Sequence, residues 1–137
     1  MPVDQRRAVG SLGERLAEVH LVRSGYRVLE RNHRTRLGEL DLIASRRGCI
    51  VFCEVRARVA GAGGAPSEFG GPLESIGPAK RRRLRRMARE WLAGGGAERL
   101  RCLGAGVAAE AFRFDAVGVV LSREGRLISL EHVEDAF

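Results

Sequence analysis

The sequence has little lysine, little cysteine and no long apolar run. Lys80 is the only lysine among 24 lysine and arginine residues. The three cysteines are an odd number and have no CxxC spacing, so we expect reduced thiols rather than a disulfide framework, and a cytoplasmic location. Because no stretch is long and apolar enough for a signal peptide or a membrane span, we expect no membrane partner.

Arginine, by contrast, is abundant and gives the chain a formal net charge of +7. Such a charge favours a polyanionic partner, nucleic acid before an anionic membrane surface. The near absence of lysine indicates a compositional bias, so arginine at any one position is a weaker signal than usual. At 137 residues the chain predicts a single domain over 1–137, large enough to bury a core without disulfides.

Residues 38–58 predict a β-hairpin around which the rest of the chain is organised. Residues 38–45 alternate with period two, and 49–58 are rich in Val, Ile and Phe. Arg46, Arg47 and Gly48 supply the turn, since glycine readily takes a positive φ. The alternation places Leu40, Leu42 and Ala44 on one face of the first strand and Glu39, Asp41 and Ile43 on the other. The same count places Glu54, Arg56 and Arg58 on one face of the second strand.

Folding this hairpin about its turn brings Asp41 opposite Glu54. Directly opposed side chains lie roughly 4.5–5.5 Å apart at Cβ, and two carboxylates at that separation repel each other. A divalent cation such as Mg²⁺ removes the conflict, and Arg56 adds a positive charge beside it. The alternative is a half-exposed sheet face with ordinary surface charges, and a slip of one residue moves Asp41 to the other face.

A helix is predicted over residues 6–24, before the hairpin. Its apolar residues recur at helical spacing and predict one buried stripe of Val9, Leu12, Leu16, Val19 and Val22 or Arg23. Gly10, Gly13, Ala17 and Leu21 form a path of small residues that allows the helix to approach a sheet closely. Glu14 can then point at the hairpin; the alternative is a solvated glutamate.

A second helix is predicted from Ser75 or Pro78 to Ala93. Lys80 continues its apolar stripe, so the single lysine is expected to point toward the sheet. Arginines cover the other faces and predict a phosphate-contacting surface, although a solvated basic face is the alternative. Residues 59–77 are rich in glycine and predict a flexible loop, either a gating flap or a plain connector.

Shorter elements complete the expected fold. Residues 26–30 predict a strand, followed by a basic turn over 31–36 that either contacts phosphates or is solvated. Residues 112–121 and 127–130 predict two further strands, and Phe137 is expected to pack on the core. The order predicts an α/β fold, a central mixed β-sheet of about five strands flanked by helices.

These residues resemble a known family. The segments GSLGERLAEVHLVRSGYRVLERNHR, GELDLIA, VFCEVRAR, FGGPLESIGPAKRRRL, RFDAV and a terminal DAF are similar, in order and over essentially the whole chain, to the YraN-like family of small bacterial proteins. The resemblance implies a restriction-endonuclease-like fold with a metal-holding core of the PD-(D/E)xK type. It extends more weakly to archaeal Holliday-junction resolvases.

The resemblance also implies a set of site residues. The family's helix acid corresponds to Glu14, its motif aspartate to Asp41, its ExK glutamate to Glu54 and its later lysine to Lys80. The three acids would hold Mg²⁺ or Mn²⁺ in an endonuclease that acts on DNA, branched or containing single strands. The family's RFD motif matches Arg113 and Asp115. We assign nucleic-acid contacts to Arg34, Arg36, Arg58, Arg82, Arg83 and Arg86.

Arg56 departs from the family, because the ExK lysine falls on this position. Arginine keeps the positive charge and can bind phosphate, but it cannot give up its proton. Lys80 can substitute if it reaches the site. Two alternatives to a nuclease therefore stay open: a non-catalytic nucleic-acid-binding module on a nuclease scaffold, and a basic adaptor that docks on an acidic protein. Related resolvases act as dimers because junctions are two-fold symmetric, so a homodimer is also considered.

Overall fold

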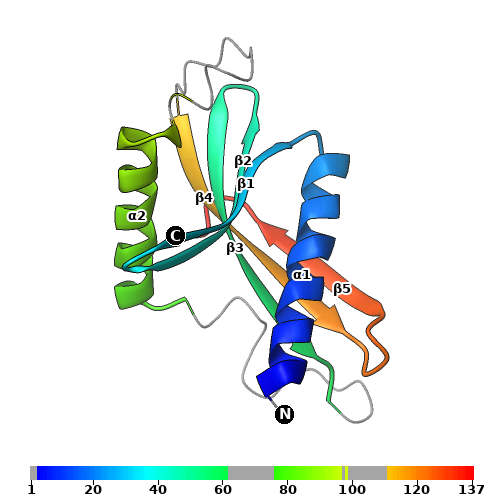
Figure 1. Cartoon of the computed structure of the whole chain (residues 1–137). Helices are drawn as coiled ribbons and strands as arrows, with labels where there is room; N and C mark the ends of the chain where they lie inside the picture. The colour runs from blue at the N-terminus through cyan, green and yellow to red at the C-terminus, as the bar shows by residue number, and fades with distance from the viewer. Residues whose placement is uncertain (1–2, 62–75, 97, 99–110) are drawn as a thin grey trace.

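A computed structural model of the chain describes residues 3–61, 76–96, 98 and 111–137. Within these residues the elements are α1 Val3–Arg23, β1 Arg27–Thr35, β2 Gly38–Arg46, β3 Cys49–Val59, α2 Pro78–Ala93, β4 Ala111–Leu121 and β5 Leu127–Val133 (Figure 1). The five strands form one sheet in sequence order. β3 and β4 are parallel, and the other neighbours are antiparallel. The predicted α/β class with a mixed sheet is confirmed and is consistent with a restriction-endonuclease-like fold.

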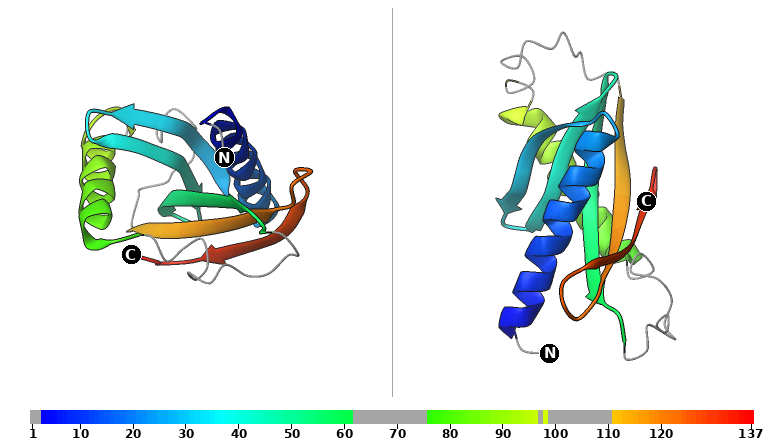
Figure 2. Two further views of the ribbon diagram at one scale, coloured as in Figure 1. Left: turned by 90° about the horizontal axis from the view of Figure 1, so that it is seen from below. Right: turned by 90° about the vertical axis from the view of Figure 1, so that its right-hand side faces the viewer.

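The two helices cover opposite faces of the sheet (Figures 1 and 2). Ala17 and Leu21 of α1 pack in a core cluster that includes Leu42, Val51 and Val117. The apolar side of α2 packs in a second cluster with Phe52 and Phe114; its members from α2 are Leu84, Met87, Ala88 and Trp91. Phe137 is buried in this second cluster, so the predicted packing of the terminal aromatic residue is confirmed.

The face of α1 that packs on the sheet is the path of small residues. Gly13 lies so close to β3 that a Cβ atom at this position would be 2.5 Å from Cβ of Ala57. Because the backbone approaches so closely here, the larger apolar residues beside the path are buried only in part. Val19 and Val22 remain 45% and 56% exposed, so the prediction of one buried stripe through them was wrong. The helix also begins at Val3 rather than at Arg6.

β1 is longer than the sequence predicted. The basic segment expected as a turn over 31–36 is mostly strand, and it pairs with β2 as far as Thr35↔Gly38. The Thr35 hydroxyl accepts a hydrogen bond from the Leu37 N–H (3.0 Å) and donates one to the Gly38 carbonyl (3.1 Å), which closes a tight turn. Local residue preference missed this strand because its pairing with β2, not its own apolar content, stabilises it.

The β2–β3 ladder ends one residue before Asp41 is reached. Its register runs from Arg46↔Cys49 to Leu42↔Cys53, so Asp41 stands opposite Glu54 one position further on, as predicted. Beyond this point β2 bends away with β1 toward α2 (Figure 2). The bend interrupts the alternation, because Leu40 joins the α2 cluster with Ile43 instead of sharing a face with Leu42. The prediction for Leu40 was wrong.

Two predicted segments lie mostly or wholly outside the described residues. They are the glycine-rich loop over 59–77, of which 62–75 are not described, and residues 98–110, which are rich in small residues and are expected to be irregular, of which 99–110 are not described. Neither described helix is long and apolar enough to cross a lipid bilayer.

Candidate metal centre

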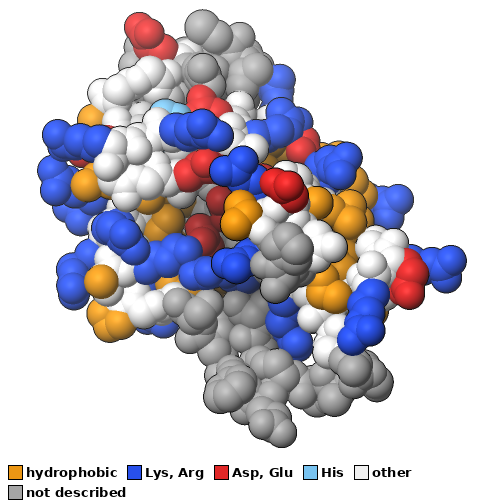
Figure 3. Space-filling model, turned by 60° about the horizontal axis from the view of Figure 1, so that its bottom comes forward, with side chains coloured by type: hydrophobic (Ala, Val, Ile, Leu, Met, Phe, Trp, Pro, Cys, Tyr) orange, Lys and Arg blue, Asp and Glu red, His pale blue; other side chains and the backbone are white. Residues whose placement is uncertain are grey.

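A cavity of about 290 Å³ lies between the arm formed by β1 and β2 and the first turns of α2. Its lining includes three acids, Glu39, Asp41 and Glu54, together with Lys80 and Arg83. On the face shown in Figure 3, acidic side chains lie at the bottom of a hollow that basic side chains surround. This arrangement of acids inside and bases outside suits a bound cation and a polyanion above it.

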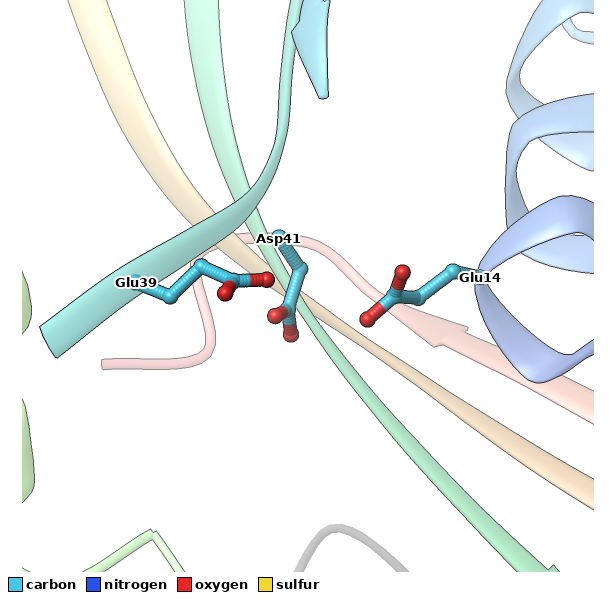
Figure 4. A group of neighbouring side chains, drawn as sticks. All are labelled: Glu14, Glu39 and Asp41. Carbon is cyan, nitrogen blue, oxygen red and sulfur yellow. The ribbon is translucent and has the colours of Figure 1, made fainter. Parts of the chain in front are cut away.

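Three carboxylates from two elements converge at the inner end of this cavity. Glu39 and Asp41 extend from β2, and Glu14 reaches them from α1 (Figure 4). One oxygen from each lies within 4.8 Å of the others. Carboxylate oxygens are the ligands that Mg²⁺ and Mn²⁺ prefer in proteins, so this group can hold a metal ion.

The divergence of β2 from β3 is what allows acids from both faces of the sheet to meet. Asp41 is just past the last β2–β3 pair, and its Oδ2 accepts a hydrogen bond from the Val55 N–H at 2.8 Å. This contact fixes the carboxylate in the opening. The close approach of Gly13 to Ala57 brings the next residue of α1, Glu14, to the same opening.

Asn32 orients two of the acids. It stands opposite Asp41 in β1, between Arg31↔Leu42 and His33↔Leu40, and has a positive φ of 49°, a conformation that asparagine tolerates better than most residues. Its amide group is 2.9 Å from Glu14 Oε2 and 2.6 Å from Glu39 Oε1. Because carboxylate oxygens only accept hydrogen bonds, the NH₂ group faces both of them.

The acids raise each other's pKa values. Burial, together with the charges of Glu54 and Glu14, raises the pKa of Asp41 to about 8 despite the hydrogen bond from Val55. Burial and the neighbouring charges of Glu39 and Glu54 also raise the pKa of Glu14, and the hydrogen bond from Asn32 partly offsets this. A divalent cation would relieve this repulsion.

Two basic side chains, those of Lys80 and Arg56, hold Glu54 on the α2 side of the opening. It is 6% exposed, and its Oε1 is 2.5 Å from Lys80 Nζ and 3.8 Å from Arg56 Nε. The predicted inward direction of Lys80 is therefore confirmed. Glu54 influences the pKa values of Asp41 and Glu14, although the three-carboxylate group contains Glu39 in its place.

Comparison with known proteins gives the family. Residues 13–119 match the model of the family described as "Uncharacterised protein family UPF0102". A UPF0102 protein of Pelotomaculum thermopropionicum is 41% identical over 134 residues, which cover 98% of each chain. One from Moorella thermoacetica is 41% identical over 96% of this chain and 97% of its own. This chain belongs to the UPF0102 family. The YraN-like resemblance is confirmed at that level, and the matched region contains every acid of the centre.

Two arginines of this UPF0102 protein, Arg56 beside Glu54 and Arg58 further along β3, carry buried guanidinium nitrogens. Arg56 and Arg58 follow Glu54 on the same face of β3, and the Nε atom of each is buried with no hydrogen-bond partner among the described residues. Buried donors are normally satisfied.

The other predicted phosphate-contacting arginines are exposed around this region. Arg83 lines the cavity, and Arg82 is exposed on α2. Three members of the set form surface ion pairs: Arg34 with Glu39 at 3.5 Å, and Arg36 and Arg86 with Glu90 at 3.4 and 3.5 Å. Such exposed pairs are weak, so these arginines are accessible to a stronger anion.

The RFD residues of the UPF0102 chain lie on the α1 side of the sheet, away from the cavity. Asp115 is fully buried and accepts hydrogen bonds from Arg113 (2.7 Å to each oxygen), His132 (2.8 Å) and the Asp135 N–H (3.0 Å). Burial raises the pKa of Asp115, but these hydrogen bonds outweigh it and lower the pKa to about 2. The RFD motif here supports the fold.

The structure adds two residues that the sequence reasoning did not assign to the site, Glu39 and Asn32. The signal for Glu39 was present, because period-two spacing put it on the face of Asp41. No local pattern indicated Asn32, because its contact to Glu14 joins β1 to a different element.

Proposed function

We propose that this protein is a metal-dependent endonuclease that acts on DNA, with branched or single-strand-containing DNA as its substrate. The observation that carries the proposal is the convergence of Glu14, Glu39 and Asp41 within 4.8 Å of one another, beside a buried Glu54 paired with a lysine. The resemblance to PD-(D/E)xK nucleases supports the reaction class, and the resemblance to Holliday-junction resolvases supports the substrate.

The proposed roles follow from the geometry. Asp41, Glu14 and Glu39 would hold Mg²⁺ or Mn²⁺, with Glu54 as a further ligand or as the partner that positions Lys80. A metal ion bound there supplies Lewis-acid stabilisation of phosphoryl charge and lowers the pKa of water. The fit is supported by the all-carboxylate donor set and by the raised pKa of Asp41.

Lys80 is proposed to supply the function that Arg56 cannot. A lysine ammonium group can give up a proton, whereas the arginine guanidinium group stays charged. Lys80 reaches Glu54 from the first turn of α2. Its ammonium group therefore contacts the same Glu54 oxygen that lies 3.8 Å from Arg56 Nε. The Lys80 ammonium group would orient the attacking water or donate a proton to the leaving oxygen, and Arg56 would stabilise the charge that develops on the phosphate.

Nucleic-acid binding is proposed to use the basic rim of the cavity. The exposed arginines of α2 and the unsatisfied Nε atoms of Arg56 and Arg58 would offer contacts to the phosphate groups of a bound strand. The +7 net charge supports a polyanionic substrate.

The proposal is tested by incubating the protein with a four-way junction, a single strand and a duplex in Mn²⁺. We expect junction cleavage by the wild type, and loss of at least about a hundredfold in Asp41→Asn and Lys80→Ala. Arg56→Lys, which restores the usual motif, should retain or increase the rate. If wild type and Arg56→Lys both leave all three substrates intact, the proposed reaction is wrong.

A second candidate, a non-catalytic nucleic-acid-binding module, is favoured by arginine at position 56. It predicts DNA binding that weakens steeply with salt and does not change with divalent metal. Gel retardation with Mn²⁺ or with EDTA separates the two candidates, because the nuclease should bind its substrate more tightly when metal neutralises the acids.

A further inference from the structure

A second cavity, of about 230 Å³, lies at the turn end of the β2–β3 hairpin, far from the carboxylates of the metal centre. Its lining, which we term the arginine pocket, consists of Tyr26, Arg46, Arg47, Cys49, Arg113 and Glu134. Three guanidinium groups from β2, the hairpin turn and β4 thus meet in one small cavity. The proposed nuclease uses none of them.

Two of the three guanidinium groups are held in place before any ligand arrives. Arg46 lies over the ring of Tyr26, 5.2 Å from the centroid, and donates to the Ser24 carbonyl at 3.1 Å. Arg113 donates to the Tyr26 hydroxyl at 2.7 Å and is fixed from behind by Asp115. Fixed donors lose little conformational entropy on binding, so the pocket is preorganised around the Tyr26 side chain, with Arg46 over its ring and Arg113 at its hydroxyl.

Arg47 completes the pocket from a backbone conformation that is unfavourable for arginine. It has φ 49° and is followed by Gly48 with φ 78°, the pattern of a two-residue hairpin turn in which asparagine is the favoured first residue. Arginine is less suited to the left-handed region than asparagine. The side chain is exposed and free to turn toward an anion.

The charge in the pocket is positive overall. Glu134 is the only acid in its lining, and it is 3.8 Å from Arg113 with a side chain that is 60% exposed. Among the charges that act on the Cys49 thiol, that of Arg113 has a larger effect than those of Asp115 and Glu134. Three guanidinium groups set against the carboxylates of Glu134 and Asp115 leave the pocket with a net positive charge.

We propose that the arginine pocket binds a phosphate monoester, either free phosphate or the terminal phosphate of a nucleic acid. Guanidinium groups bind phosphate oxygens through paired N–H donors, and three groups around one cavity match the three terminal oxygens of a monoester. A phosphodiester inside a strand offers fewer oxygens and less charge.

The pocket is separate from the metal centre. Arg46 follows Asp41 by five residues of β2, which span roughly 17 Å at about 3.4 Å per residue, so one phosphate group cannot contact both. Phosphate binding in this pocket requires no cleavage activity, so it is measured in EDTA.

The test measures binding of inorganic phosphate, and of one short oligonucleotide with and without a 5′-phosphate, by calorimetry. The central variant is Arg47→Asn, which removes one guanidinium and gives the turn its favoured residue, so the fold should be retained or stabilised. We expect phosphate binding to weaken about tenfold or more. Glu134→Gln should strengthen it, and Arg123→Asn, the same charge change in the β4–β5 turn, should leave it unchanged.

Cys49 provides an independent readout, because it lines the pocket and is partly exposed. Phosphate should slow alkylation of Cys49, located by peptide mass spectrometry, in the wild type but not in Arg47→Asn. Binding of inorganic phosphate supports a free ligand, and a preference for the 5′-phosphorylated oligonucleotide supports a nucleic-acid end. The proposal is overturned if neither phosphate form binds, or if Arg123→Asn weakens binding as much as Arg47→Asn.

Discussion

The fold disfavours the ionised form of Asp41, which the proposed metal centre requires. Its carboxylate has one backbone donor, Val55, and three acidic neighbours, Glu14, Glu39 and Glu54. Burial and the charges of Glu54 and Glu14 raise its pKa to about 8. An ionised carboxylate is destabilised at this position unless a positively charged group binds to it, and a divalent cation is the simplest candidate.

The raised pKa of Asp41 gives a signed prediction for the metal-free protein. The native state holds this proton more tightly than the unfolded chain, so the free energy of unfolding should fall as pH rises from about 4 to about 8. Asp41→Asn should abolish that fall and raise stability at pH 8 by about 1–3 kcal/mol. Urea unfolding in EDTA at several pH values measures this; an identical pH profile in the variant would contradict it.

Lys80 and Arg56 make a matched pair for separating charge from proton transfer. Lys80→Arg keeps a positive charge near Glu54 but not an exchangeable proton. We expect it to retain DNA binding within a few-fold and to lose cleavage by about a hundredfold or more. Equal cleavage by Lys80→Arg and wild type would mean that Lys80 contributes its positive charge and no proton transfer.

Several residues of the site were predictable because the hairpin determines them locally. Period-two alternation and one turn gave the register that opposes Asp41 to Glu54, and helical spacing gave the inward direction of Lys80. The contribution of Glu39 and the contact of Asn32 depend on the bend of β2 away from β3. That bend arises from packing of the β1–β2 arm toward α2, which no local pattern encodes.

At the scale of elements, the close contact of α1 with β3 positions Glu14. Gly13→Ala would place a Cβ 2.5 Å from Ala57 and push the helix outward. We expect a loss of about 1–3 kcal/mol in unfolding free energy together with weaker Mn²⁺ binding, because Glu14 moves with the helix. Gly10→Ala is the control: a Cβ there meets nothing within 4 Å, so helix propensity should make it neutral or stabilising. Equal effects of the two variants would argue against the close contact.

The packing face of α1 and the length of β1 show where sequence patterns mislead. Large apolar residues predicted a stripe through Val19 and Val22, but small residues allowed the closer and larger contact. The basic residues of β1 predicted a turn, yet pairing with β2 made them a strand. In both cases a partner element determined the outcome.

Asp115 joins three elements and gives a second pH prediction. His132 of β5 contacts Asp115 of β4 at 2.8 Å and His20 of α1 at 3.0 Å. Because the pKa of Asp115 is lowered to about 2, its contribution is complete above about pH 4 and is lost as pH falls toward 2. Asp115→Asn should cost about 3–5 kcal/mol at pH 7 and flatten the acid limb of the stability curve, as thermal unfolding between pH 2 and 7 would show. An unchanged acid limb would contradict this.

Among the charges of the whole molecule, basic side chains surround the acidic cavity on the face shown in Figure 3, which predicts how DNA binding responds to salt. Replacing Arg82, Arg83 and Arg86 together by alanine should reduce the slope of log affinity against log salt by about 2–3. The matched control replaces Arg23, Arg123 and Arg126, which are also exposed but lie away from the cavity. Equal reductions in the two triple variants would mean that binding senses net charge and no particular surface.

The most direct measurement is anomalous diffraction from a crystal of this protein soaked in Mn²⁺. The account predicts one strong anomalous peak bounded by oxygens of Asp41, Glu14 and Glu39, and its loss in Asp41→Asn. A fully soaked crystal without density at these carboxylates, or with manganese only elsewhere on the surface, would contradict it.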